Sequence, residues 1–296
     1  MHYDPIKLRL AHWLRMPFLR RSFHLALDLL FLRAWYVRRE LRRISDFGFG
    51  ISESDTPQSA LRNPKLLDAG MGFGQYSDRL GRMFPGAKLV GLEIDRAHLY
   101  GGEDYFRRAR PAARIVIGDV QTLPLAPEQF DLILTVDVME HIPDDRATFA
   151  EFARVLKVGG LLMMHTPRVR DKGEGIRDKD TPPSPLPLAG GSKRGWEVGE
   201  HIRDGYRDGE ARERLEAAGL EVVRMVHGYG KPGMVGWTLL QRIPMTMLGW
   251  SFLMIPLVVL FLIVALPAAL AAMWLDYARG EHPDGGSLLV VARKRK

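Results

Sequence analysis

Short apolar runs alternate with helical stretches between Asn63 and Gly160, and this alternation limits the fold more than any other feature of the sequence. The runs are rich in leucine and β-branched residues, which favour strands. Strict alternation of strand and helix favours a parallel sheet covered by helices on both faces. We expect strands at Lys65–Asp68, Lys88–Glu93, Arg114–Gly118, Phe130–Val136 and Gly160–His165, and helices at Gln75–Phe84, Arg96–Arg108 and Asp144–Leu156.

Two further strands are expected later in the chain, at Leu220–His227 and Ser287–Ala292. A helix at Arg207–Ala218, ended by Gly219, precedes the first of them. Ligands of doubly wound sheets collect at the carboxyl ends of the strands, so the residues that follow each strand are the first candidates for a site.

The segment from Ile243 to Leu275 has 33 residues without a charge. A stretch of this length is typical of a membrane element, and a buried core helix is the alternative. Because strands of one predicted sheet lie on both sides of it, the chain must return to the side of the membrane that it left. We therefore expect a hydrophobic helical hairpin, re-entrant or interfacial, within 230–284, broken near Gly249 or Pro256.

The positive charge of the chain is confined to its N-terminal end. The formal net charge is +7, and ten basic and three acidic residues between Met1 and Ser45 account for all of it. Arginines alternate there with leucine and aromatic residues. This pattern is typical of basic amphipathic helices on an anionic membrane surface, although such helices can also pack on the protein's own core. We expect no export signal, because Asp28 and Arg33 interrupt the best apolar run.

The predicted turn after the first strand combines an acid with three glycines, as Asp68, Gly70, Gly72 and Gly74. Glycines let the backbone approach a ligand, and the free amide groups of the next helix favour its anionic end. Glu93 closes the second strand, where a carboxylate can accept hydrogen bonds from both ribose hydroxyls of a nucleoside.

Two more strand ends bring polar groups to the same edge of the sheet. Asp119 and Val120 follow the third strand, where the carboxylate can accept from an exocyclic adenine amine. Asp137 and His141 follow the apolar central strand. Together with the glycine turn, these residues describe a pocket for a nucleoside with an amino-acid-like tail.

With these motifs the sequence resembles the class I, Rossmann-like S-adenosylmethionine-dependent methyltransferases, in particular the group that includes quinone and small-molecule methylating enzymes. The resemblance extends from about Asn63 to Leu220 and is completed by the last strand. It implies an α/β fold with a doubly wound sheet, mostly parallel with an antiparallel last strand, and S-adenosyl-L-methionine as cofactor. The implied cofactor-binding residues are Asp68, Gly70, Gly72 and Gly74 around the methionine part, Glu93 at the ribose, Asp119 with Val120 at the adenine, and Asp137 near the substrate side.

Composition and resemblance together divide the chain into three parts. Residues 1–50 are expected to form basic amphipathic helices, and residues 51–231 with 284–296 the methyltransferase domain. Residues 232–283 are expected to be a hydrophobic, membrane-associating insertion. Within the domain, the proline-rich segment 166–200 is expected to be a lid loop.

Transfer of an activated methyl group requires alignment and exclusion of water more than an elaborate catalytic device. A base matters only when the acceptor must lose a proton. The candidates are His141, His165 and His201, each of which could instead be structural. We expect no metal site, because the chain has no cysteine and its other histidines lack the spacing of ligands.

The expected protein is a membrane-associated methyltransferase on the cytoplasmic face, which methylates the oxygen of a lipophilic or lipid-linked small-molecule acceptor. The alternatives are a methyltransferase of a glycan or polysaccharide intermediate, an RNA methyltransferase, and a cofactor-binding membrane scaffold without turnover. Nucleic acid is disfavoured, because residues 137–140 replace the acceptor-side tetrapeptide of adenine-methylating enzymes. The sequence predicts no particular oligomeric state.

Overall fold

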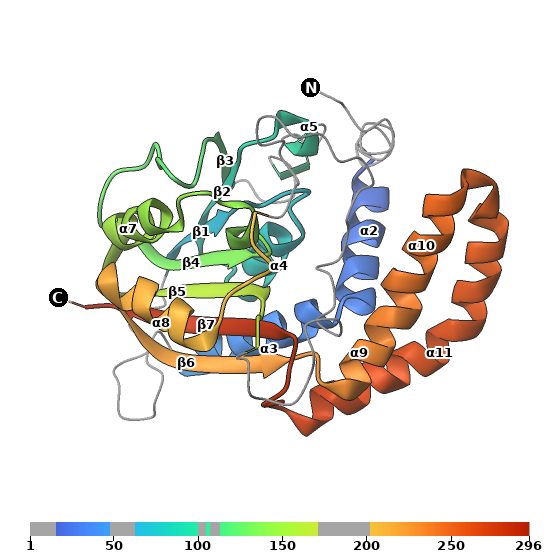
Figure 1. Cartoon of the computed structure of the whole chain (residues 1–296). Helices are drawn as coiled ribbons and strands as arrows, with labels where there is room; N and C mark the ends of the chain where they lie inside the picture. Colours follow the sequence, from blue (N-terminus) through green and yellow to red (C-terminus); the bar gives the residue numbers. More distant parts are fainter. Residues whose placement is uncertain (1–15, 48–62, 100–104, 107–112, 171–201, 296) are drawn as a thin grey trace.

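The fold is centred on a seven-stranded sheet with the strand order β3-β2-β1-β4-β5-β7-β6 (Figure 1). The structure is a computed structural model that describes residues 16–47, 63–99, 105–106, 113–170 and 202–295. The strands are β1 (Lys65–Ala69), β2 (Lys88–Glu93), β3 (Ala113–Ile117), β4 (Phe130–Val136), β5 (Leu156–Pro167), β6 (Leu220–Gly228) and β7 (Ser287–Lys294).

The first five strands run parallel, and β7 lies antiparallel between β5 and β6. This arrangement confirms the predicted α/β fold class, including its antiparallel last strand. Strand β5 is longer at both ends than expected. Leu156 already pairs with Phe130 of β4 directly after the preceding helix, and Thr166 and Pro167 still pair with β7.

Helices cover both faces of the sheet, which explains why β4 is apolar on both sides. One face packs against α7 (Asp145–Val155) and α8 (Asp208–Ala217), and the other against α3 (Leu32–Phe47) and α4 (Gln75–Met83). The side chain of Asp144 accepts a hydrogen bond from the Ala147 N–H at 2.9 Å and so caps the start of α7.

The two N-terminal helices bury different kinds of side chain: α3 turns an apolar face toward the domain, and α2 (Pro17–Leu30) turns a polar face. Helix α3 buries Tyr36, Val37 and Leu41 against the sheet, which is the alternative of core packing that the sequence left open. Helix α2 instead turns Arg20 and His24 inward and leaves Phe18, Leu25 and Leu29 exposed. Residues 1–15 of the predicted basic segment lie outside the described residues.

A helical hairpin joins β6 to β7, as the sequence predicted. Its outgoing arm comprises α9 (Lys231–Trp237), the π-helical η3 (Thr238–Arg242) and α10 (Ile243–Trp250). The chain turns at Ser251 and the short η4 (Phe252–Met254), between the two predicted break positions, and returns as α11 (Ile255–Arg279). Because β6 and β7 are neighbours, the hairpin leaves and re-enters the domain at the same edge of the sheet.

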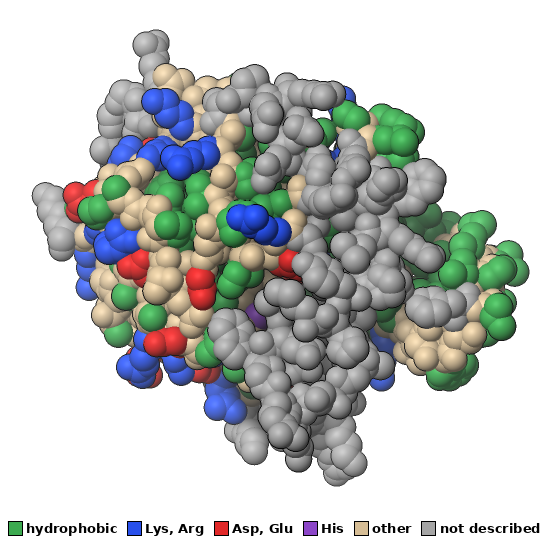
Figure 2. Space-filling model, turned by 90° about the horizontal axis from the view of Figure 1, so that it is seen from above, with side chains coloured by type: hydrophobic (Ala, Val, Ile, Leu, Met, Phe, Trp, Pro, Cys, Tyr) green, Lys and Arg blue, Asp and Glu red, His purple; other side chains and the backbone are tan. Residues whose placement is uncertain are grey.

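The far part of the hairpin projects from the domain as an antiparallel pair, α10 and α11 (Figure 1). Among the described residues, α11 is the one helix long and apolar enough to cross a membrane by length and composition. Figure 2 shows hydrophobic side chains gathered on the projecting end, whereas charged side chains lie over the body of the domain.

A buried carboxylate attaches the base of the hairpin to the domain. Asp276 is fully buried, accepts from the Tyr36 hydroxyl at 2.7 Å and accepts from the Gly233 N–H at 2.9 Å. A side chain at position 233 would bring its Cβ within 2.7 Å of the Asp276 carboxyl carbon, so only glycine allows this approach. The cluster therefore holds α3, α9 and α11 together.

We expect Tyr36→Phe to lower the free energy of unfolding by about 1.5–3 kcal/mol, because the buried Asp276 carboxylate loses a donor. Urea denaturation followed by circular dichroism measures the change. Tyr277→Phe is the matched control, since the Tyr277 ring packs against Trp35 and Tyr36 while its hydroxyl makes no hydrogen bond within the described part of the chain. Equal losses in the two variants would contradict the role of Asp276.

Candidate functional site

The glycine turn between β1 and α4 leaves an open space at one position. Gly70, Gly72 and Gly74 all have positive φ angles. A Cβ at Gly70 would collide with Val138, and one at Gly74 would collide with Phe106, whereas a Cβ at Gly72 would meet nothing within 4 Å. Gly70 and Gly74 thus serve close packing, and Gly72 adjoins space that a ligand can fill.

Two buried acids lie beside this turn. Glu93, at the end of β2, accepts from the Gly72 N–H at 2.7 Å and from the Asp95 N–H at 3.0 Å. Asp68, on β1, accepts from the Ser77 hydroxyl at 2.6 Å. Burial raises the pKa of Asp68 to about 7; the charge of Glu93 acts in the same direction, while the bond from Ser77 opposes it.

The third acid of the predicted site follows β3. The half-buried Asp119 carboxylate accepts from the Gln121 backbone N–H at 2.9 Å and from the Gln121 side-chain amide at 3.1 Å. Val120 is buried in the core on the α7 side. The Gly118 N–H donates to the Glu93 carbonyl at 3.1 Å, so the ends of β2 and β3 stay together.

A second polar cluster lies at the end of β4, around Asp137. One carboxylate oxygen pairs with the Arg33 guanidinium at 2.6 Å, and the other is 2.7 Å from His165 Nδ1. Burial favours the neutral acid, but Arg33 and His165 outweigh it and lower the pKa of Asp137 to about 2. Asp137 also adopts a positive φ of 52°, a conformation rare for non-glycine residues and found at functional sites.

The three predicted base candidates have different positions. His165 is buried on β5 in contact with Asp137. His141 is half-buried in the short 3-10 turn η2 (Met139–His141), and its charge also favours ionised Asp137. His201 and residues 171–200 of the predicted lid loop lie outside the described residues.

Helix α2 forms part of the glycine turn's surroundings, which sequence reasoning missed. Arg20 donates to the Phe73 carbonyl at 2.9 Å, and His24 Nε2 lies 3.1 Å from the same oxygen. Asp28 accepts from the Gln75 side chain at 2.8 Å and pairs with Arg79. Arg33 was missed as well; the signal available was a single arginine in the run Phe31-Leu32-Arg33-Ala34-Trp35.

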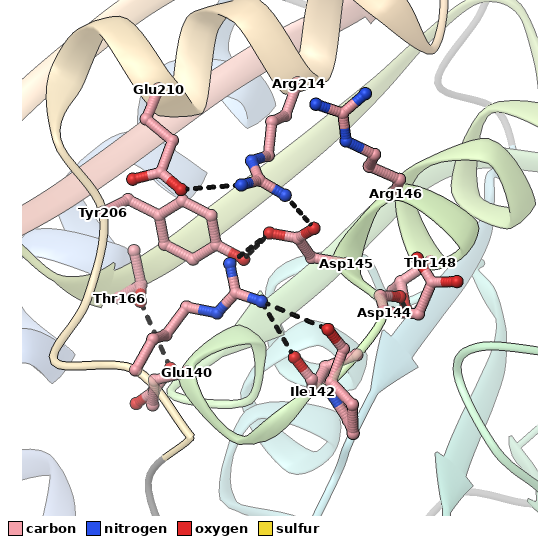
Figure 3. A network of polar contacts seen from close by, with 12 residues as sticks. Glu140, Ile142, Asp144, Asp145, Arg146, Thr148, Thr166, Tyr206, Glu210 and Arg214 are labelled. Atoms are coloured by element: carbon pink, nitrogen blue, oxygen red, sulfur yellow. Dashed lines mark hydrogen bonds and ion pairs between the residues drawn. The ribbon is translucent and has the colours of Figure 1, made fainter.

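An ion-pair network holds the chain that follows the undescribed segment (Figure 3). The buried Asp145, at the start of α7, pairs with Arg203 and Arg214 and accepts from the Tyr206 hydroxyl at 2.8 Å. Arg203 thus binds both a carboxylate and the Ile142 carbonyl oxygen. The network fixes residues 203–206 against η2 and α7 beside the site.

No group of three or more histidine, aspartate or glutamate side chains that could hold a metal ion occurs among the described residues. The polar groups of the site are instead carboxylates, backbone amides and His165, which is paired with Asp137. Their chemistry suits an organic ligand with hydroxyl and amino groups.

Residues 67–164 match the family model of a methyltransferase domain. The chain is 29% identical over 168 residues to a protein of Mycolicibacterium smegmatis described as a probable S-adenosylmethionine-dependent methyltransferase, covering 56% of each chain. It is 27% identical over 135 residues to a ubiquinone biosynthesis O-methyltransferase of Pelagibacter ubique, covering 46% of this chain and 52% of that protein. The chain thus spans about half the length of these curated relatives.

A solved structure shares the fold. Phosphoethanolamine N-methyltransferase 2 from Haemonchus contortus, in complex with S-adenosyl-L-methionine, aligns with a TM-score of 0.51 at 16% identity, covering 88% of this chain and 53% of that chain. The likeness to this structure shows the fold, and residues 67–164 are similar to a methyltransferase domain. The open space at Gly72 and the acids at three neighbouring strand ends fit a nucleoside such as S-adenosyl-L-methionine.

We expect Gly72→Val to abolish binding of S-adenosyl-L-homocysteine measured by calorimetry, because the side chain fills the open space at the turn. Gly159→Val is the matched control: Gly159 also has a positive φ and nothing within 4 Å of a Cβ, but it lies in the exposed first part of strand β5. Both variants carry backbone strain of about 1–2 kcal/mol. Unchanged affinity in Gly72→Val would contradict the pocket.

We expect the wild-type protein to lose stability as the pH rises from about 4 to about 7, and we expect Asp68→Asn to abolish this loss. The folded protein holds the Asp68 proton up to about pH 7, whereas the unfolded chain releases it near pH 4. Ionisation therefore opposes folding between these values, by up to about 4 kcal/mol. Thermal melts of the cofactor-free protein between pH 4 and pH 8 should show the variant gaining on the wild type as pH rises. A constant difference across this range would contradict the raised pKa.

Proposed function

We propose that this methyltransferase domain works at a membrane surface, where it transfers a methyl group from S-adenosyl-L-methionine to the oxygen of a lipophilic or lipid-linked small-molecule acceptor. The observation that carries the proposal is the apolar hairpin. At its tip Trp250 is 76% exposed and Leu253 is 89% exposed. Large apolar patches on a protein surface mark sites of protein or membrane interaction.

The exposed face continues along α11 from the tip to the base. Its members share one side of the helix, whereas Ala265, Ala269 and Met273 face inward. At 1.5 Å per residue, the 25 residues of α11 span about 38 Å, which is longer than the roughly 30 Å thickness of the hydrocarbon core. The exposed large side chains are Ile255, Leu257, Val259, Leu260, Ile263, Val264, Trp274 and Leu275.

The cytoplasmic face is the proposed side of attachment. Lys231, Arg242 and Arg279 are exposed on the hairpin helices, toward the domain from the uncharged tip. An excess of lysine and arginine beside membrane segments favours the cytoplasmic side. The basic residues of α2 and α3 add to the same charge.

Within the site, the proposed holders of the cofactor are the acids and the glycine turn. Glu93 and Asp119 would accept from ribose hydroxyls and the adenine amine, and the turn around Gly72 with Asp68 would surround the methionine part. The group supplies an activated methyl when bound. What this chain's residues add is orientation, exclusion of water, and a place for the acceptor's proton.

Oxygen is the proposed atom of the acceptor, because the Asp137–His165 pair provides a proton-accepting group near the glycine turn. The Pelagibacter relative is named an O-methyltransferase, which supports the same choice. The lipophilic class of the acceptor is supported by the hairpin.

The decisive test incubates the full-length protein with methyl-labelled S-adenosyl-L-methionine and separate membrane-lipid, glycan and RNA fractions, followed by mass spectrometry. Label in a lipid-fraction product, attached through oxygen, is the expected result. Label confined to the glycan or RNA fraction would overturn the acceptor class. Cofactor binding without label in any fraction would instead identify a scaffold without turnover.

We expect the double substitution Trp250→Ser with Leu253→Ser to weaken partition onto anionic lipid vesicles by about a hundredfold, since two large side chains contribute about 3 kcal/mol of burial. Flotation with liposomes measures it. Val158→Ser is the control, because Val158 is exposed at the opposite end of β5 from the hairpin. Unchanged flotation of the double variant would move the attachment away from the tip.

A further inference from the structure

Three buried polar atoms around Asp137 have unused hydrogen-bonding capacity within the described part of the chain. They are Arg33 Nε, Tyr76 Oη and His165 Nε2, from α3, α4 and β5. Arg33 and His165 both contact Asp137. Tyr76 interacts with the charge of Asp137 and, through a side-chain hydrogen bond, with the Arg33 guanidinium, which leaves the Tyr76 hydroxyl hydrogen free to donate. Buried polar groups are almost always paired, so three atoms with unused capacity in one cluster call for an explanation.

The contact with Asp137 determines which nitrogen of His165 can accept a proton. The Asp137 carboxylate is ionised and can only accept, so His165 carries its hydrogen on Nδ1 and donates it at 2.7 Å. In the neutral form of this tautomer, Nε2 carries a free lone pair. The His165 side chain is only 4% exposed, so this lone pair points into the protein interior rather than into bulk water.

The cluster adjoins the glycine turn. Tyr76 is the second residue of α4, directly after the turn. Val138, the residue after Asp137, packs so closely on Gly70 that a Cβ there would collide with it. The turn is the proposed methionine end of the cofactor site, so the three polar atoms lie next to the part of the cofactor that carries the methyl group.

The three atoms match one kind of acceptor group. Arg33 Nε and the Tyr76 hydroxyl can each donate a hydrogen bond, and His165 Nε2 can accept one. A neutral hydroxyl accepts two hydrogen bonds and donates one, so it offers the kinds of partner that these three atoms lack. A carboxylate or phosphate ester dianion has no proton for Nε2, and an ammonium group would be repelled by Arg33.

We propose that Arg33, Tyr76 and His165 bind the hydroxyl group of an alcohol or phenol acceptor, and that His165 Nε2 takes its proton. This inference rests on the proposed function and names its acceptor group. The hydroxyl oxygen loses its proton to Nε2 and forms a bond to the methyl carbon, while the electron pair of the broken methyl–sulfur bond stays on sulfur. The resulting imidazolium is stabilised by Asp137, which Arg33 holds in place.

The first experiment measures label transfer to the membrane-lipid fraction. We expect His165→Gln to lower the rate by about a hundredfold or more and Tyr76→Phe by about tenfold. Affinity for S-adenosyl-L-homocysteine should stay within about twofold in both variants. His227→Gln is the matched control, because His227 pairs with Asp208 at 3.0 Å away from the cluster and its loss should leave the rate unchanged. A wild-type rate in His165→Gln would overturn the assignment.

The second experiment needs no turnover. Nitrogen-15 spectra of the histidine side chains in the detergent-solubilised, S-adenosyl-L-homocysteine-bound protein should show His165 as the neutral Nδ1–H form, assigned by its absence in His165→Gln. Added 1-octanol should shift the Nε2 resonance, whereas octanoate and octylamine should not. An Nε2–H form, or no shift with octanol, would overturn the inference.

Discussion

The ion pair between Arg33 and Asp137 connects the N-terminal helices to the centre of the sheet. It joins the first turn of α3 to the end of β4 at 2.6 Å and keeps Asp137 ionised, so that the same carboxylate can orient His165. Asp137 has a positive φ, and its backbone N–H also donates to the His165 carbonyl at 2.9 Å. Without α3 the polar cluster would lose its cation, and the glycine turn would lose the helix pair that lies over it.

Much of the fold could be predicted from local pattern. The apolar strands β2 and β4 have the predicted limits, and the hairpin followed from the requirement that two strands of one sheet flank an uncharged segment. Helix α2 could not be predicted in the same way. Its pattern shows two faces, but which face is buried depends on the Phe73 carbonyl, 49 residues beyond His24 in the sequence.

The residues of the candidate site also fall into two groups, those whose positions follow from local sequence and those that depend on long-range contacts. The acids and glycines follow strands directly, so their positions at one edge of the sheet could be read from the sequence. The contact between Asp137 and His165 requires the register of two strands, in which Val136 pairs with His165. To predict the contact between Arg33 and Asp137, one must also know how α3 docks on the sheet. A single arginine among apolar residues is a weak signal for that docking.

The polar inner face of α2 couples the docking of this helix to the conformation of the glycine turn, although the two segments are far apart in the sequence. Arg20 and His24 bind the carbonyl at the middle of the glycine turn, so α2 in its docked position favours one conformation of that turn. Thermodynamic linkage makes this effect mutual. If docked α2 strengthens the binding of a ligand that requires this conformation, the bound ligand stabilises the docking of α2 by the same free energy.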